Sequence, residues 1–287
     1  MEILKIAKIA GGQDGAIYGD SLFRLDSHGH GFVYRIPDLP CDGSEATPAA
    51  TFTLECAGTL VPHSNAVFFG KEKYAEGDPY PLLYTNIYNN YAGKPEPYIG
   101  VLCAFRLFCE GGGIVGRLVQ TVKVGFCEDP ALWRATPEAH SIRPYGNFVY
   151  DGEGALYAFV MRSEALGTRF FRFAMPAAGA GVASATFPGV REVTLTADDI
   201  LACFDLPLFH FVQGACFHGG CIYSTEGFTN DEKNRPAMRV IDPATATMQY
   251  IDLPALGIHE EPEMIDFSDG VCYYSDLYGA LYTVDFA

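Results

Sequence analysis

Short apolar runs recur along the chain, and most of them either alternate with polar residues or stay apolar for four to seven residues. They are rich in Val, Ile, Phe and Tyr, and they are separated by Asp-Gly, His-Gly-Gly and Ser-Asp-Gly. This pattern is typical of strands joined by tight turns, because successive side chains of a strand point to opposite faces of the sheet. We find no sustained stripe at helical spacing, so the chain is predicted to be all-β.

The apolar runs are grouped into five units of similar design. Each unit opens with polar residues, continues with a short apolar strand and a turn, and adds an aromatic-rich strand. The units align on Ala16, Ala66, Phe148, Ala215 and Met264. Repeated small sheets of this kind close into a ring, so we predict a five-bladed β-propeller. Its blades are expected over about residues 10–58, 59–126, 143–196, 209–254 and 258–287.

The two chain ends predict how the ring closes. The fifth unit contains only three strand-like runs, whereas the alternating residues 1–9 have no strand of their own to pair with. We expect residues 1–9 to form the outer strand of the last blade, because a closed ring hides edge strands that would otherwise aggregate. The whole chain, 1–287, would then form a single domain.

Charge and composition narrow the possible partners and compartment. The net charge of −16 repels phosphate groups, so nucleic acid and membrane surfaces are not expected partners, whereas a small neutral or cationic ligand is. Residues 1–9 lack the apolar core of a signal peptide, and no stretch approaches the ~20 apolar residues that span a bilayer. Nine scattered cysteines without a C-x-x-C pair indicate buried thiols in a reducing compartment. The chain is therefore expected to be cytoplasmic.

Polar residues precede the first strand of every unit, and this strand lies beside the central channel of a propeller. We predict that these residues form a ring at one channel mouth and bind a small polar ligand such as a carbohydrate. The predicted ligand-binding residues are Gln13, Asp14, His63, Asn65, Asn147, Gln213, Glu261 and Glu263. The alternative is that they only satisfy strand ends and trapped water.

The same positions leave an enzyme open, with His63, Tyr145 and Glu263 as catalytic candidates. A glycoside hydrolase would pair Asp14 with Glu261 or Glu263, although the amides in the other units cannot transfer protons. A lyase would use His63 as base and Tyr145 or Arg143 to stabilise an anionic intermediate. A protein-interaction scaffold with an inert channel is the third possibility.

Metal binding has weaker support in the sequence. Asp14 and Glu263 could ligate a calcium ion, but no D-x-D-x-D-G loop is present, so no cofactor is expected. His28 and His30 have a metal-like spacing in a turn that is expected to be exposed. Residues 89–91, Asn-Asn-Tyr, end a tyrosine- and asparagine-rich insertion whose tip suits sugar binding. Short helical connectors between blades are expected at 128–134 and 196–201.

Four motifs carry a family resemblance: Q-D-G-A-I-Y-G-D, H-S-N-A-V-F-F-G, L-L-Y-T-N-I-Y-N-N and E-P-E-M-I-D-F. They resemble five-bladed β-propeller proteins of unknown function from bacteria, which implies the same fold and no particular activity. The E-P-E segment is also similar to the final-blade motif of several ligand- or calcium-binding propellers. This resemblance favours binding near Glu261 and Glu263.

Overall fold

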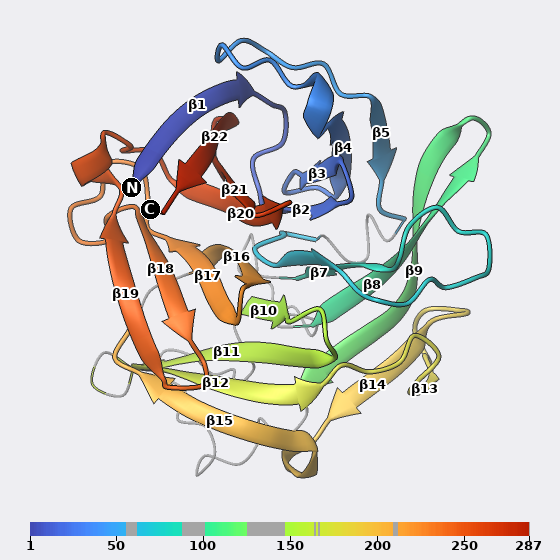
Figure 1. Cartoon of the computed structure of the whole chain (residues 1–287). Coiled ribbons are helices and arrows are strands. Elements are labelled where there is room, and N and C mark those ends of the chain that lie inside the picture. The colour runs from blue at the N-terminus through green and yellow to red at the C-terminus, as the bar shows by residue number, and fades with distance from the viewer. Residues whose placement is uncertain are drawn as a thin grey trace.

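Five sheets surround one central axis in the computed structural model of the chain (Figure 1). The structure describes residues 1–55, 62–87, 101–124, 147–163, 165, 167–208 and 212–286. Four of the sheets contain four strands and one contains six, and in each sheet four strands pair antiparallel in a meander, as the short runs and tight turns of the sequence predict.

The blades are described in the order of the chain. Blade 1 contains β2 (Gly15–Tyr18), β3 (Ser21–Leu25), β4 (His30–Arg35) and β5 (Ala50–Thr53). Blade 2 contains β6 (Val67–Phe69), β7 (Leu83–Asn86), β8 (Leu102–Glu110) and β9 (Gly113–Val124). Blade 3 contains β10 (Asn147–Tyr150), β11 (Ala155–Ser163), β12 (Gly167–Ala174) and β15 (Ile200–Leu206). Blade 4 contains β16 (Val212–His218), β17 (Cys221–Glu226), β18 (Ala237–Asp242) and β19 (Thr247–Asp252). Blade 5 contains β20 (Pro262–Ser268), β21 (Val271–Asp276), β22 (Ala280–Asp285) and β1 (Glu2–Lys8).

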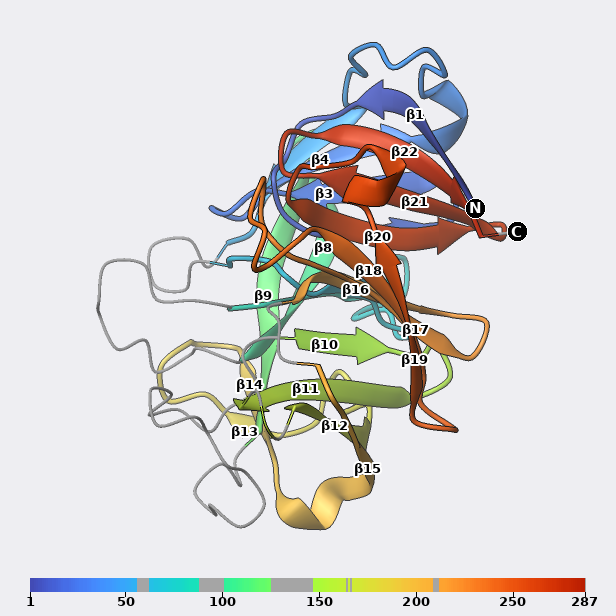
Figure 2. The same ribbon diagram turned by 90° about the vertical axis from the view of Figure 1, so that its left-hand side faces the viewer.

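Strand β1 closes the ring, as the alternation of residues 1–9 predicts. It runs antiparallel to β22, with Glu2 opposite Asp285 and Lys8 opposite Ala280. Ile6 and Ala7 are buried in an apolar cluster that also contains Leu22 of blade 1. Figure 2 shows the ring edge-on, with both chain ends on the same side. The innermost strands β2, β6, β10, β16 and β20 contact one another in this order around the axis.

Blade 3 departs from its expected bounds of 143–196. Its outer strand is β15, and the segment before β15 forms β13 (Val182–Ala183) and β14 (Arg191–Leu195), which join the sheet of blade 2. Strand β14 pairs parallel to β9, from Arg191 opposite Gln120 to Leu195 opposite Val124. The physical reason is the length of β9, whose 12 residues leave an outer edge that β14 covers.

The structure describes one of the two expected helical connectors. Residues 196–201 contain one 3-10 turn, η2 (Ala197–Asp199), in which the Asp199 carboxylate accepts a hydrogen bond from the Thr196 hydroxyl at 2.8 Å. This turn leads from β14, in the sheet of blade 2, into β15 of blade 3, so it connects two blades as expected. Residues 128–134 lie outside the described residues. Two further 3-10 turns are η1 (Ile36–Asp38) and η3 (Pro254–Leu256), and no helix in the described ranges is long and apolar enough to cross a membrane.

The two ends of the inner strands differ in chemistry. Buried polar side chains lie near their starts, whereas half-buried or exposed aromatic rings lie near their ends and pack between neighbouring blades. The ring centroids of Tyr18 and Phe69 are 5.3 Å apart, and those of His218 and Phe267 are 4.0 Å apart and nearly parallel. The aromatic end therefore holds the blades together by packing, and the buried polar groups lie at the other end.

Candidate functional site

A group of polar side chains meets near the axis where the inner strands begin, and we name it the axial cluster. Its members are Asp14, Arg24, Asn65, Asn147, Gln213, Glu261 and Glu263. Asp14 and Arg24 are 0% exposed and Glu263 is 2% exposed, whereas Glu261 is only half-buried. The cluster therefore has a deep part around Arg24 and an outer part at Glu261.

Main-chain contacts bring the members of the axial cluster together across blades. The Asp14 Oδ2 atom accepts a hydrogen bond from the Val67 amide at 2.9 Å, which ties blade 1 to blade 2. Gly214 in blade 4 lies against both Asp14 and Glu263. A Cβ atom at residue 214 would lie 2.9 Å from Asp14 Oδ1 and 2.5 Å from the Glu263 carbonyl oxygen. Only glycine permits this approach, so Gly214 sets the spacing of three blades.

The substitution Gly214→Ala is expected to destabilise the fold by about 1–3 kcal/mol, because the added methyl group pushes β16 away from β20 and Asp14. Urea unfolding of both proteins measures this change. Gly179→Ala is the matched control, because a Cβ atom there meets nothing within 4 Å. Equal stability of the Gly214→Ala variant and the parent would contradict the close approach.

Three side chains from three blades form a hydrogen-bonded chain, which we name the amide relay. The Asn65 Nδ2 atom of blade 2 donates to the Gln213 Oε1 atom of blade 4 at 2.6 Å. The Gln213 Nε2 atom in turn donates to Glu261 Oε1 of blade 5. The relay thus connects the buried side of the cluster to its half-exposed carboxylate.

Arg24 is the member that the sequence reading missed. It lies on β3, the second strand of blade 1, and its Nη2 atom donates to the Asp276 carbonyl oxygen at 2.9 Å. Burial raises the pKa of Asp14 and of Glu263 well above their usual values, and the nearby Arg24 guanidinium opposes both shifts. A lone arginine in the otherwise uncharged run S-L-F-R-L was the available signal.

Several buried polar atoms of the cluster make no hydrogen bond within the described ranges. The acceptors among them are Asp14 Oδ1, Asn65 Oδ1, Asn147 Oδ1 and Glu263 Oε2, and the donors are Arg24 Nε and Nη1. Gln13, beside the cluster, adds its Oε1 atom to the acceptors. Buried polar groups in folded proteins almost always have a partner. These orphaned atoms are available to hydrogen-bond a buried water molecule or a ligand.

The residues that the sequence suggests for catalysis differ in burial and protonation state, and some of them lie outside the described residues. Burial lowers the pKa of His63 to about 4, so the imidazole is neutral at pH 7. Tyr145, Arg143 and residues 89–91 lie outside the described residues. Asp14 and Glu263 belong to neighbouring blades, as ring closure predicts, and both side chains are almost fully buried. This burial disfavours a glycoside hydrolase that would use this pair.

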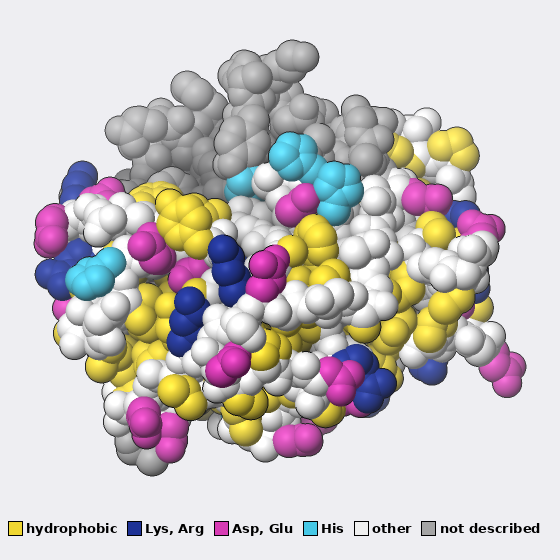
Figure 3. Space-filling model, turned by 90° about the horizontal axis from the view of Figure 1, so that it is seen from above, with side chains coloured by type: hydrophobic (Ala, Val, Ile, Leu, Met, Phe, Trp, Pro, Cys, Tyr) yellow, Lys and Arg dark blue, Asp and Glu magenta, His cyan; other side chains and the backbone are white. Residues whose placement is uncertain are grey.

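Metal binding receives no support from the described part of the chain. Among the described residues no cluster of three His, Cys, Asp or Glu side chains could hold a metal ion. A calcium ion fits Asp14 and Glu263 poorly, because the positive charge of the nearby Arg24 already lowers the pKa of both carboxyl groups. His28 and His30 are exposed, and His30 Nδ1 lies 2.8 Å from Asp26 Oδ2. Figure 3 shows histidine side chains gathered beside a carboxylate at one rim of the molecule.

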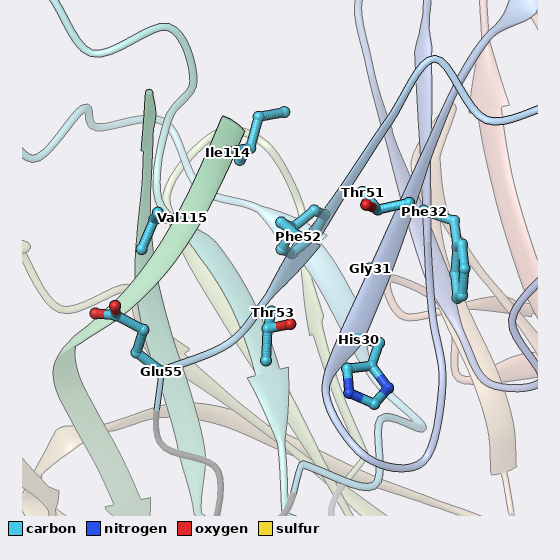
Figure 4. A pocket seen from close by; sticks show the side chains of 9 residues that line it. All are labelled: His30, Gly31, Phe32, Thr51, Phe52, Thr53, Glu55, Ile114 and Val115. Carbon is cyan, nitrogen blue, oxygen red and sulfur yellow. The ribbon is translucent and has the colours of Figure 1, made fainter. Parts of the chain in front are cut away.

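A hollow of about 530 Å³ lies at the perimeter, away from the axial cluster. It lies between strands β4 and β5 of blade 1 and strand β9 of blade 2 (Figure 4). Phe52 stands between its two walls, and the ring of Phe52 occupies the space where a side chain at Gly31 would lie. The hollow thus results from how two outer strands diverge, and it contains no group of the axial cluster.

No protein-family model matches the chain, and no curated protein matches it. Among solved structures, the glutaminyl cyclase of Myxococcus xanthus aligns over 99% of this chain and 96% of its own, with 14% identity and a TM-score of 0.50. At that identity the likeness concerns the fold. The chain is a five-bladed β-propeller. The β-propeller domain of Cps50 (Swd1) from Myceliophteria thermophila covers 98% of this propeller and of itself, with 10% identity and a TM-score of 0.43. The WD40 domain of Doa1 covers all of this propeller and 97% of itself, with 12% identity and a TM-score of 0.41.

Proposed function

We propose that this propeller binds a small hydroxyl-rich molecule, such as a carbohydrate, at the mouth formed by the starts of its inner strands. One observation carries the proposal. Within the described ranges, orphaned buried acceptors outnumber orphaned buried donors, and they come from blades 1, 2, 3 and 5. Each buried polar atom without a partner costs about 1–3 kcal/mol, so a ligand that satisfies several of them gains that free energy on binding.

The chemistry of the acceptors favours hydroxyl groups. Asn65 and Asn147 offer neutral carbonyl oxygens, which accept from hydroxyl groups without needing a charge on the ligand. A hydroxyl oxygen can also accept from the guanidinium of Arg24, whereas an ammonium group cannot. A polyol therefore matches both kinds of orphaned atom. The half-buried Glu261 marks the side from which such a ligand enters.

Asn147→Leu tests the proposal by removing one orphaned acceptor and keeping the side-chain size. The free protein is expected to gain about 1 kcal/mol of stability, because Leu needs no hydrogen-bond partner. Ligand binding is expected to weaken at least tenfold. Thermal unfolding is measured with D-glucose, D-galactose, L-arabinose and sorbitol, since a ligand that binds only the folded state raises the midpoint temperature.

Gln120→Met is the matched control for Asn147→Leu. Gln120 is also a buried amide with an orphaned oxygen, but it lies on the outer strand β9 and donates to the Ala177 carbonyl at 2.8 Å. This variant is expected to lose stability and keep the parent's response to the sugar. An equal response in Asn147→Leu and the parent would place the site elsewhere. No response in the parent to any probe would instead favour a scaffold with a water-filled channel.

Catalysis at the same mouth is a second candidate, and the half-exposed Glu261 favours it. Burial raises the pKa of this carboxyl, so it can hold a proton and act as a general acid. The fold of the M. xanthus glutaminyl cyclase shows that a chain of this architecture can carry an enzyme. Aryl glycosides and a peptide with N-terminal glutamine are the substrates to test. Release of aryl alcohol or ammonia that is lost in Glu261→Gln would establish turnover at this mouth.

A further inference from the structure

We infer that Glu261 sets the ligand preference of this mouth by fixing the direction of the amide relay. The inference rests on the proposed function, and it makes Glu261 a positioning residue that acts through Gln213 and Asn65. The relay crosses blades 2, 4 and 5, so residues far apart in the sequence decide together which polar atom faces the axis.

An ionised carboxylate can only accept hydrogen bonds, whereas a side-chain amide has one end that donates and one that accepts. Glu261 therefore requires the NH₂ group of Gln213 on its side, which turns Gln213 Oε1 toward Asn65. Gln213 Oε1 in turn requires the NH₂ group of Asn65 at 2.6 Å. The Oδ1 atom of Asn65 is thus left as one of the orphaned acceptors. One carboxylate determines the orientation of both amides.

The side-chain amides of Asn65 and Gln213 do not fix their own orientations. The Asn65 main chain is fixed, because its N–H donates to Asn86 Oδ1 at 2.9 Å, but its side-chain amide fits two orientations of nearly equal shape. Gln213 has the same two-fold freedom. Glu261 is held in place from both sides of its main chain. Its N–H donates to Thr229 Oγ1 at 2.9 Å, and its carbonyl oxygen accepts from the Leu277 amide at 2.8 Å.

Reversal of the relay would invert the site. A donor at residue 261 would bond to Gln213 Oε1, Gln213 would donate to Asn65, and Asn65 would present its NH₂ group in place of Oδ1. The mouth would then favour ligands that accept hydrogen bonds. The relay therefore converts the chemistry of a single rim residue into the hydrogen-bonding preference of the buried site.

Charged groups surround Glu261, the residue that sets the direction of the amide relay. Glu260 and Glu263 flank it along the chain, and Glu263 faces Asp14 and Arg24 of blade 1. Burial raises the pKa of Glu261, so its carboxyl gains a proton earlier than an exposed glutamate as the pH falls. Below that pKa the O–H group can donate to Gln213. Polyol binding is therefore expected to weaken as the pH falls through the pKa of Glu261.

Glu261→Lys tests the inference, because lysine can only donate hydrogen bonds. Sorbitol and the sugar that binds the parent best are titrated by calorimetry, with inorganic phosphate as the acceptor-rich probe. Polyol binding is expected to weaken at least tenfold. Glu260→Lys is the control with the same charge change next to the relay, and it is expected to keep polyol binding within threefold of the parent. In Glu261→Gln the new amide can either donate to Gln213 or accept from it. Its polyol affinity is therefore expected to lie between those of Glu261→Lys and Glu260→Lys.

A second substitution separates the relay from simple damage to the site. In the double variant Glu261→Lys with Asn65→Asp, residue 65 again presents an acceptor oxygen to the ligand while accepting from Gln213. Polyol binding is expected to recover to within threefold of the parent. A disrupted mouth would not be rescued by a second change. Equal polyol affinity in the parent and Glu261→Lys, or no recovery in the double variant, would overturn the inference.

A readout without ligand keeps the two proposals distinguishable. The side-chain amide resonances of Asn65 and Gln213 are measured by ¹⁵N NMR in the parent, Glu261→Lys and Glu260→Lys. Both are expected to shift in Glu261→Lys and to stay in place in Glu260→Lys. Unchanged amide resonances in Glu261→Lys would overturn the inference, whether or not the parent binds a polyol. Shifted resonances in a parent that binds no polyol would support the relay and contradict the proposed function.

Discussion

Replacing Arg24 with Met is expected to destabilise the fold by about 3–5 kcal/mol near neutral pH, because it leaves buried carboxylates without their cation. Arg24 is 0% exposed, and it faces Glu263, Asp14 and Asp276. Urea unfolding monitored by circular dichroism measures the loss. Arg117→Met is the matched control, because Arg117 is exposed and pairs with Glu55 at the surface. An exposed pair of this kind contributes at most about 1 kcal/mol.

The pH dependence of the Arg24→Met variant follows from the raised pKa values of Asp14 and Glu263. A carboxyl whose folded pKa is raised binds more protons in the folded state than in the unfolded state. Its contribution to stability is present at acid pH and is lost as the pH rises through the folded pKa. Without Arg24 both pKa values rise further, so the variant is expected to lose less stability near about pH 5 than near about pH 8. Adding Glu263→Gln is expected to restore part of the lost stability, and a loss independent of pH would contradict the electrostatic role of Arg24.

Removing residues 1–9 is expected to abolish the single cooperative unfolding transition of the propeller. The deletion takes away β1, exposes the paired edge of β22, and uncovers the cluster that Ile6, Ala7 and Ile9 complete. Burial of the two isoleucines alone is worth on the order of 5 kcal/mol. Size-exclusion chromatography and thermal unfolding are expected to show aggregation and a broad transition.

A peptide with the sequence of residues 1–9 provides the positive control for this deletion. Added in excess, it is expected to pair with β22 and restore a cooperative transition, since β1 is held by strand pairing. The same peptide with Ile6→Asp and Ala7→Asp is expected to have no effect, because both side chains are buried in the closed ring. A deletion variant that unfolds like the parent without peptide would show that β1 does not close the ring.

The sequence predicted the fold through features that are local in the chain. Strand alternation and the unpaired residues 1–9 sufficed for the blades and for ring closure, and the polar residues before each inner strand marked one end of the channel. The side chains of Asp14 and Asn65 are buried, and ligand binding by them stays a prediction.

The remaining features depend on contacts between distant residues. Arg24 was missed because strand alternation does not reveal that both faces of β3 are covered, and all five residues of β3 are buried. The amide relay needs Asn65, Gln213 and Glu261 at hydrogen-bond distance, and the glycine at 214 sets that spacing in three dimensions. The pairing of β14 with β9 joins segments about 70 residues apart, and neither segment indicates its partner.

The position of β14 makes the joints between blades unequal. Strand β14 forms a five-residue ladder with blade 2 and then continues into blade 3, whereas the joint between blades 5 and 1 has isolated main-chain hydrogen bonds at Lys8, Gly43 and Ala46. If β14 stays with blade 3, separating blades 2 and 3 breaks the main-chain hydrogen bonds between β14 and β9 at the same time. Separating surfaces that only pack against each other breaks no such bonds. We therefore expect blades 2 and 3 to separate less readily than blades that are joined by fewer main-chain hydrogen bonds.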